Sequence, residues 1–261
     1  MPDYAKLIDA ETWAFIERTN SYYPPDTSHF TMAQHREVYD AMCRGFHYPY
    51  PSGVTSFDGE VPTPTRKVPV RIYRSGLPAS TALVLYFHGG AFTLGGLESH
   101  DSICADLAAG TGYEVIAVDY RLVPEHLHPA QFEDAMNAFE WATETSDRPV
   151  VLCGDSAGGN LVAAVSHATR DHRRRPAGQV LIYPGLGGDI GEGSYVEHAD
   201  APLLTLQDIV NYRGIRSGGA TEAGDVTQWP LADHDFSGLP PTVVITAQCD
   251  PLSSDGEVYR D

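Results

Sequence analysis

The sequence predicts an α/β protein built on a mostly parallel, doubly wound sheet, and three observations lead to this prediction. From residue 68 onward, short apolar and β-branched runs alternate with longer stretches of helical pattern. That alternation is typical of parallel strands joined by crossover helices. The run over residues 82–87 (ALVLYF) is apolar enough to be buried on both faces, as parallel strands are. At 261 residues the chain is long enough for one large domain of this kind.

The predicted elements follow one another in a regular order. Six runs are predicted to be strands: residues 68–73, 82–87, 114–118, 150–153, 180–182 and 242–247. Three helices are predicted between them, over residues 97–109, 129–143 and 159–169. Pro129 suits the first turn of its helix, because a residue there has no intrahelical amide bond to lose.

Two regions do not follow this alternation, residues 1–48 and the glycine-rich residues 185–224. Together they contain three further predicted helices: residues 10–17, 31–42 and 203–212. We expect both regions to form a helical cap over the active site of a catalytic domain that spans residues 49–261. Ordinary peripheral packing is the alternative interpretation.

Composition and charge exclude several classes of function. The formal net charge of −18 disfavours binding to nucleic acid or to an anionic membrane, because both would repel the protein. No stretch approaches the roughly 20 apolar residues that cross a bilayer, and the first residues lack the pattern of a signal peptide. We therefore expect a cytoplasmic protein. The four cysteines show neither metal-ligand spacing nor a paired pattern, so we expect no disulfide, no metal and no cofactor.

Residues 154–158 (GDSAG) carry the first catalytic signal. They fit the G-x-S-x-G pattern of a nucleophile elbow, a sharp strand-to-helix turn that lifts a serine out of the sheet. Small residues are needed there because bulky neighbours would clash in the turn. An apolar run precedes the pattern and a helix-forming run follows it, as the turn requires. Ser156 is the predicted nucleophile.

Residues 88–92 (HGGAF) follow a predicted strand and carry the second signal. Loops of this kind place backbone N–H groups against the oxyanion of an acyl-transfer reaction, together with the N–H of the residue after the serine. We therefore assign Gly89, Gly90 and Ala157 as oxyanion donors. His88 is expected to orient the loop and to transfer no proton. A phosphate-binding loop is excluded, because no lysine follows the glycines and no G-x-G-x-x-G pattern occurs.

These two motifs resemble those of the hormone-sensitive-lipase family of carboxylesterases, which includes bacterial acetyl esterases and implies the α/β-hydrolase fold. The resemblance covers residues from about 65 to 261, and three further segments agree with it. Residues 129–135 (PAQFEDA) resemble a helix of the family. Residues 119–125 (DYRLVPE) resemble the family's DYRLxPE segment, which implies that Arg121 and Glu125 brace the oxyanion loop. Residues 250–256 (DPLSSDG) resemble the segment whose first aspartate is the family's catalytic acid.

By this resemblance Asp250 orients the catalytic base. Its place just after the predicted strand at residues 242–247 suits an α/β active site. The order along the chain also fits, because the hydrolase triad runs serine, then aspartate, then histidine. A surface-loop aspartate is the alternative. Asp155, beside the serine, is expected to be a structural or substrate-side residue rather than a member of the triad.

The histidine of the triad is where the sequence departs from the family. All eleven histidines precede Asp250, whereas the family's base follows its acid and is followed by a final helix. We expect the last strand, the histidine and the last helix to be absent from this chain, which leaves it inactive alone. Residues 242–247 would then form an uncovered sheet edge. The expected explanation is a second polypeptide that carries these elements, or their loss from the recorded sequence.

The sequence therefore predicts a serine carboxylesterase that hydrolyses short-chain acyl esters through an acyl-enzyme intermediate. Its expected partner is a small ester substrate. The alternative is a catalytically dead hydrolase-fold protein that binds a small molecule, as plant gibberellin receptors, which resemble this family, do. The retained Ser156, Asp250 and loop glycines favour the enzyme over the receptor. An inactive gene fragment is a third interpretation.

Overall fold

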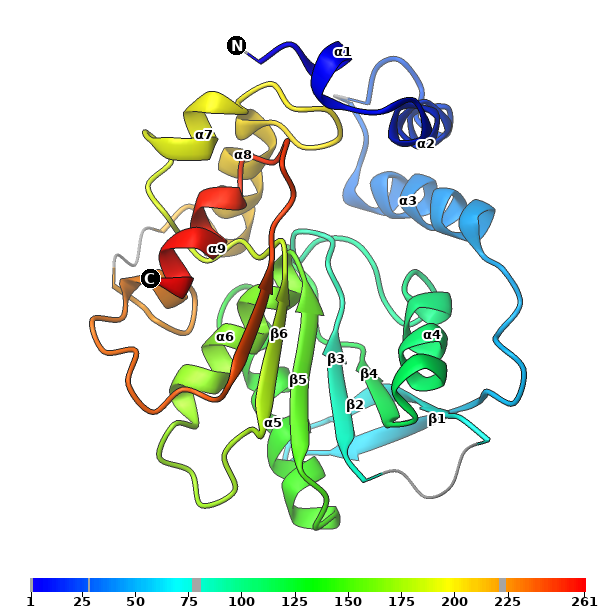
Figure 1. The fold of residues 1–261 in the computed structure, drawn as a ribbon, viewed down its shortest axis with the longest axis vertical. Helices are drawn as coiled ribbons and strands as arrows, with labels where there is room; N and C mark the ends of the chain where they lie inside the picture. Colours follow the sequence, from blue (N-terminus) through cyan, green and yellow to red (C-terminus); the bar gives the residue numbers. More distant parts are fainter. Residues whose placement is uncertain (1, 28, 77–80, 221–223) are drawn as a thin grey trace.

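A single sheet runs through the centre of the molecule in the computed structural model, which describes residues 2–27, 29–76, 81–220 and 224–261 (Figure 1). Within these residues its strands lie in the order β1-β2-β4-β3-β5-β6-β7. Neighbours from β4 to β7 pair in parallel, whereas β2 pairs antiparallel with both β1 and β4. The strands are β1 Thr55–Pro62, β2 Lys67–Arg74, β3 Leu83–Phe87, β4 Glu114–Val118, β5 Val150–Asp155, β6 Gly178–Ile182 and β7 Thr242–Ile245.

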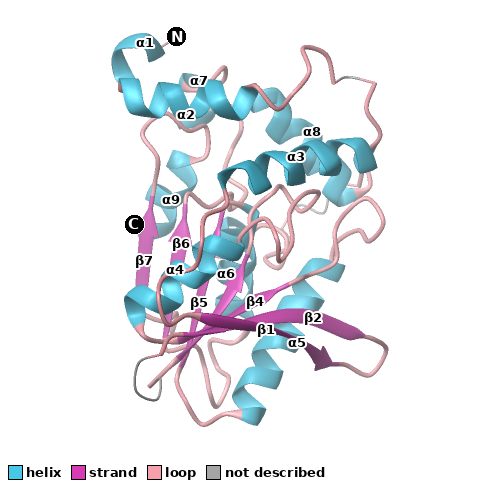
Figure 2. Ribbon diagram, turned by 90° about the vertical axis from the view of Figure 1, so that its right-hand side faces the viewer, coloured by secondary structure: helices cyan, strands magenta, loops and turns pink. Residues whose placement is uncertain are grey.

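Helices cover both faces of this sheet (Figure 2). The first face is covered by α5 (Ala130–Thr145) and α6 (Ala157–Ala168), and the second by α4 (Asp101–Thr111). Leu85 and Tyr86 are neighbours on β3 but belong to different apolar cores, because successive side chains of a strand point to opposite faces. The other helices are α1 Tyr4–Leu7, α2 Ala10–Asn20, α3 Met32–Phe46, α7 Gly193–Glu197, α8 Leu206–Ser217, α9 Ser253–Arg260 and the 3-10 helix η1 Pro230–Ala232.

The predicted α/β-hydrolase architecture, a mostly parallel and doubly wound sheet, is confirmed. All six predicted strands occur, and every residue of β3 and β4 is buried, as their apolar sequences indicate. The pattern does not predict β1, because this edge strand is largely exposed and has no apolar run. Helix α4 begins at Asp101, since residues 97–100 form turns instead of the predicted first helical turn.

Helices α1, α2, α3 and α8 lie over the carboxyl ends of the parallel strands (Figure 1). The predicted helices at residues 10–17, 31–42 and 203–212 correspond to α2, α3 and α8. The division into cap segments 1–48 and 185–224 stays a prediction, and residues 1, 28 and 221–223 of these segments lie outside the described residues. Within the described part of the chain, we find no helix whose length and apolar character would suffice to span a bilayer.

Strand β7 forms one edge of the sheet and pairs only with β6 among the described residues. Val243 and Ile245 on this strand are 54% and 47% exposed, and Val258 on the adjacent α9 is 60% exposed. An apolar strand at a sheet edge offers unpaired backbone groups to another strand. Among the described residues the predicted strand thus lies at a sheet edge with two apolar side chains exposed, and whether a further strand covers this edge stays a prediction.

Candidate active site

Ser156 lies at the sharp turn between β5 and α6, where the sequence pattern places it. Its φ and ψ angles of 51° and −115° lie outside the regions that residues with a side chain favour, and such strain is typical of functional sites. Neighbouring glycines make the turn feasible. A Cβ at Gly158 would clash with the carbonyl oxygen of Phe87, and one at Gly154 would lie 2.5 Å from the carbonyl carbon of Gly158. The serine thus stands at the carboxyl ends of the strands and at a helix N-terminus, which favours developing negative charge.

The loop after β3 brings backbone amides to the same place. Gly90 and Ala91 have φ angles of 113° and 53°, so the chain reverses tightly after the strand. Ala91 lines one cavity together with Ser156 and Ala157. Among the described residues we find no acceptor for the amides of Gly90, Ala91 and Ala157. These three N–H groups are therefore available to a substrate oxygen.

The amide of Gly89 is not available in this way. It donates to Asp155 Oδ1 at 2.9 Å, which commits it to the protein interior. The structure therefore corrects the prediction that Gly89 is an oxyanion donor. Ala91 supplies an unengaged amide instead. The HGGAF pattern contains this residue, but a sequence pattern does not show which of its amides turns inward.

The carboxylate of Asp155 is buried beneath this loop at the centre of a hydrogen-bond network. Besides the Gly89 amide, it accepts from Tyr86 Oη at 2.7 Å and lies 3.3 Å from Nε2 of His100. Burial raises the pKa of the carboxyl, but the bonds from His100 and Tyr86 outweigh burial and lower it overall. Asp155 is thus ionised at neutral pH and braces the loop against the nucleophile elbow, which fits the structural position expected for it.

His88 is fully enclosed in the same network. Its Nδ1–H donates to the Gly89 carbonyl at 2.7 Å, and its ring stacks on that of Tyr120 with 4.3 Å between the centroids. Burial lowers the pKa of His88 to about 4, and the charge of the neighbouring His100 acts in the same direction. A neutral imidazole fixed in this way bonds to the loop and is uncharged at neutral pH, and its role in orienting the loop stays a prediction.

The DYRLVPE segment bonds directly to the loop, because Tyr120 Oη donates to the His88 carbonyl at 2.6 Å and the N–H of Val123 donates to the Phe92 carbonyl at 2.9 Å. The two charged residues of the segment have other partners. Arg121 donates to both carboxylate oxygens of Asp134 on α5, at 3.0 Å to each. Glu125 accepts two bonds from Arg36 on α3, at 2.9 and 2.8 Å. The Nε–H of Arg36 also donates to the carbonyl of Thr93, at 2.8 Å. Arg36, which no motif marks, thus ties an N-terminal helix to the oxyanion loop.

Asp250 follows β7 and lines a wide cavity of about 660 Å³ together with Ser156. Its Oδ1 accepts the N–H of Leu252 at 2.8 Å. Burial raises the pKa of this carboxyl, although the bond from Leu252 and the nearby His198 act in the opposite direction. The structure therefore brings the predicted nucleophile and the predicted acid to one cavity.

All eleven histidines lie in the described part of the chain, yet none of them bonds to Ser156 Oγ or to the Asp250 carboxylate. His88 and His100 belong to the loop network, and Nδ1 of His198 lies 3.2 Å from Tyr4 Oη. The same described residues contain no group of three or more side chains placed to hold a metal ion.

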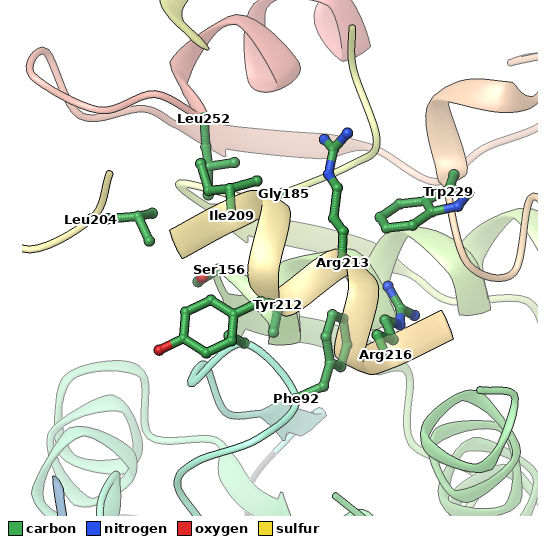
Figure 3. Close-up of a pocket in the computed structure, with 12 residues that line it drawn as sticks. Phe92, Ser156, Gly185, Leu204, Ile209, Tyr212, Arg213, Arg216, Trp229 and Leu252 are labelled. Atoms are coloured by element: carbon green, nitrogen blue, oxygen red, sulfur yellow. The ribbon is translucent and has the colours of Figure 1, made fainter. Parts of the chain in front are cut away.

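A second, narrow cavity of about 80 Å³ also reaches Ser156 (Figure 3). Most of its lining is apolar, with Phe92 and Leu252 on opposite sides and Tyr212 from α8 between them. Two arginines of α8, Arg213 and Arg216, also line it. Ser156 therefore lies between a wide cavity and a narrow one.

Comparisons with known proteins agree with this geometry. Residues 84–261 match a family model described as an alpha/beta hydrolase fold. The carboxylesterase NlhH of Mycobacterium tuberculosis is 37% identical over 210 residues, which cover 74% of this chain and 64% of the relative. The arylesterase of Saccharolobus solfataricus is 32% identical over 263 residues, which cover 97% of this chain and 84% of the relative.

Solved structures of esterases superpose on this fold. A hyperthermophilic esterase from the archaeon Pyrobaculum calidifontis superposes with a TM-score of 0.86 at 31% identity, covering 97% of this chain and 83% of that one. The chain spans less than two thirds of the length of the mycobacterial carboxylesterase that it matches.

Proposed function

This chain belongs to the hormone-sensitive-lipase family of α/β-hydrolase esterases, and on that premise we propose that it acts as a serine carboxylesterase with Ser156 as nucleophile. One observation carries the proposal. Ser156 lies in a strained turn at a helix N-terminus and shares a cavity with Ala91 and Ala157, whose amides are unengaged among the described residues. Such strain costs about 1–3 kcal/mol and persists where it serves a site.

In acylation, Ser156 Oγ bonds to the ester carbonyl carbon while a base takes the serine proton. The bond from that carbon to the alkoxy oxygen then breaks, and the departing alkoxide receives the proton. Water repeats the sequence on the acyl-enzyme and releases the carboxylic acid. The amides of Gly90, Ala91 and Ala157 stabilise the carbonyl oxygen as it gains negative charge.

We propose that Asp250 orients a histidine base that does not come from residues 1–261. The support is that no described histidine bonds to Ser156 Oγ or to the carboxylate of Asp250. A longer chain and a second polypeptide are both sources of such a residue. Mass spectrometry of the active protein under denaturing conditions distinguishes them, since a second polypeptide adds a second mass.

We also propose that the substrates carry short acyl groups. The narrow cavity beside Ser156 measures about 80 Å³, whereas an apolar cavity that binds benzene measures about 150 Å³. The rate constant kcat/KM should therefore be highest for esters with two to six acyl carbons. A preference for acyl chains of twelve or more carbons would contradict this proposal.

A fluorophosphonate reagent tests the nucleophile directly. It should label the active protein at Ser156 and leave Ser156→Ala unlabelled, while the exposed Ser237→Ala control is labelled as the parent is. Labelling that persists in Ser156→Ala would refute the assignment. The alternative of a small-molecule binding protein needs no base, and so it is also compatible with the absence of a described histidine bonded to Ser156 Oγ. That alternative predicts neither labelling nor hydrolysis, but saturable binding of ester analogues.

A further inference from the structure

Arg216 occupies an unusual position for a charged residue. It is only 1% exposed and lines the narrow cavity. Its guanidinium carbon lies 3.7 Å from the ring centroid of Phe92 and 5.4 Å from that of Trp229. Figure 3 shows the side chain beside these two rings, at the end of the cavity away from Ser156.

Hydrogen bonds fix this guanidinium in place. Nη1–H donates to the Gln228 carbonyl at 3.0 Å, and Nη2–H donates to Asn160 Oδ1 at 3.2 Å. Asn160 is itself held, since its Nδ2–H donates to the Gly185 carbonyl at 2.8 Å. A planar guanidinium held at two nitrogens and covered by aromatic rings is far stiffer than a methionine chain, which adapts to the space around it. The end wall that Arg216 forms is therefore rigid.

The narrow cavity suits the acyl side of an ester. Ala91 and Ala157, whose amides are assigned to the oxyanion, line it together with Ser156. During turnover the alcohol must leave and water must enter, while the acyl group stays bound to the serine. The cavity of about 80 Å³ therefore suits the acyl chain, and the alcohol leaves on the other side of Ser156.

We propose that Arg216 is the specificity-determining residue of this site: its guanidinium, held against Phe92 and Trp229, ends the acyl cavity and limits the acyl chain length. The inference rests on the proposed esterase function and deepens it by naming the residue that excludes long acyl groups. The substrate class that follows is esters of short carboxylic acids.

Binding of acyl anilides with two to ten acyl carbons tests whether Arg216 ends the acyl cavity, and this test does not require turnover. These amides resist hydrolysis, and their constant phenyl ring is too large for the narrow cavity, so the acyl chain is directed into it. Each buried methylene strengthens binding about fourfold. Calorimetry on the parent protein should show this gain for the first few carbons and no gain beyond them. Affinity that rises steadily to ten carbons would overturn the proposal without any variant.

Arg216→Ala should remove the limit on the length of the acyl chain that binds. The decanoyl anilide should bind about tenfold or more tightly than to the parent, while acetanilide changes by less than about threefold. Arg173→Ala is the control, because that side chain is exposed and lines neither of the two cavities at Ser156. It should keep the parent's length limit.

Other outcomes have distinct meanings. An equal loss of affinity for every anilide in Arg216→Ala would mean that Arg216 only anchors α8, and would overturn the proposal. Arg216→Met, which keeps the volume but not the rigidity, should give an intermediate limit, and circular dichroism checks that each variant folds. If ester hydrolysis survives Ser156→Ala, the proposed function fails, whereas the anilide series still decides whether Arg216 ends the cavity.

Discussion

The nucleophile side and the acid side of the site are built in different ways. Strand β5, which carries Ser156, pairs on both sides and is almost entirely buried, whereas β7, which leads to Asp250, pairs on one side and is mostly exposed. Asp155 has donors from three residues, but Asp250 accepts a single amide bond from the described residues. The interior of the sheet thus fixes the nucleophile and the oxyanion loop, whereas the described residues give the Asp250 carboxylate a single bond.

The two carboxyls also show that burial alone does not decide their charge. Both are largely buried, and burial raises the pKa of each. Bonds from His100 and Tyr86 reverse this effect for Asp155, and the partners of Asp250 do not reverse it there. An opposite charge within a few ångströms lowers the pKa of a carboxyl. The acid side therefore gains most from a neighbouring cation such as an imidazolium.

The largest effect is expected from removing the charge of the acid. In the form of the protein that hydrolyses esters, Asp250→Asn should lower kcat about 10⁴-fold, as loss of the acid's charge does in the serine-protease triad. The control Asp200→Asn changes an exposed carboxyl and should leave kcat unchanged. Steady-state kinetics with a short-chain ester measures both. An Asp250→Asn variant with the parent's kcat would show that the acid lies elsewhere.

A smaller loss of kcat is expected from disturbing the oxyanion loop on the nucleophile side. Gly90 has a φ of 113°, and a Cβ there would clash with the carbonyl of Leu94. Gly90→Ala should therefore misplace the oxyanion amides and lower kcat about 10²–10³-fold. Gly110→Ala is the matched control, because a Cβ at that helical position meets no atom within 4 Å. Equal kcat values for the two variants would mean that the Gly90 loop does not bind the oxyanion.

The buried His88 on the nucleophile side should also make the stability of the protein depend on pH. The pKa of His88 is about 4 in the folded protein and 6.5 in the unfolded chain, so folding disfavours the protonated ring. The stability tied to the neutral form is complete above pH 6.5 and is lost as the pH falls toward 4, by up to about 3 kcal/mol. Urea titrations at several pH values give the free energy of unfolding as a function of pH. Between pH 4 and 6.5 this free energy should change less with pH for His88→Gln than for the parent. The exposed His234→Gln should show the same pH dependence as the parent.

The smallest effect on folding is expected at the edge strand. Val243→Lys places a charge on a side chain that is already 54% exposed, so the free energy of unfolding should change by about 0.5 kcal/mol or less. Self-association measured by light scattering should fall, because lysine at an edge discourages strand pairing. Val196→Lys, on the 56% exposed Val196 of α7, should leave association unchanged. If both variants self-associate to the same extent, the edge of β7 is not the surface through which copies of the protein associate.

Sequence reasoning succeeded where a local pattern determines the geometry. The elbow at Ser156 follows from small residues within five positions, and β3 follows from its unbroken apolar run. It failed for Gly89, whose amide orientation depends on the carboxylate of Asp155, 66 residues away. Arg36 and Arg216 escaped notice for the same reason, since their partners come from distant segments and no spacing within the sequence marks them.

The bond from Arg36 to the Thr93 carbonyl has a consequence for exchanging parts between related enzymes. Helix α3 lies over the carboxyl ends of the parallel strands, so exchanging it with the helix of a relative is one way to change which substrates enter the site. Here the same helix supports the turn that carries the Gly90 and Ala91 amides. A chimera that replaces residues 32–46 would therefore alter how the developing charge is held as well as which ester enters, unless an arginine is kept at position 36.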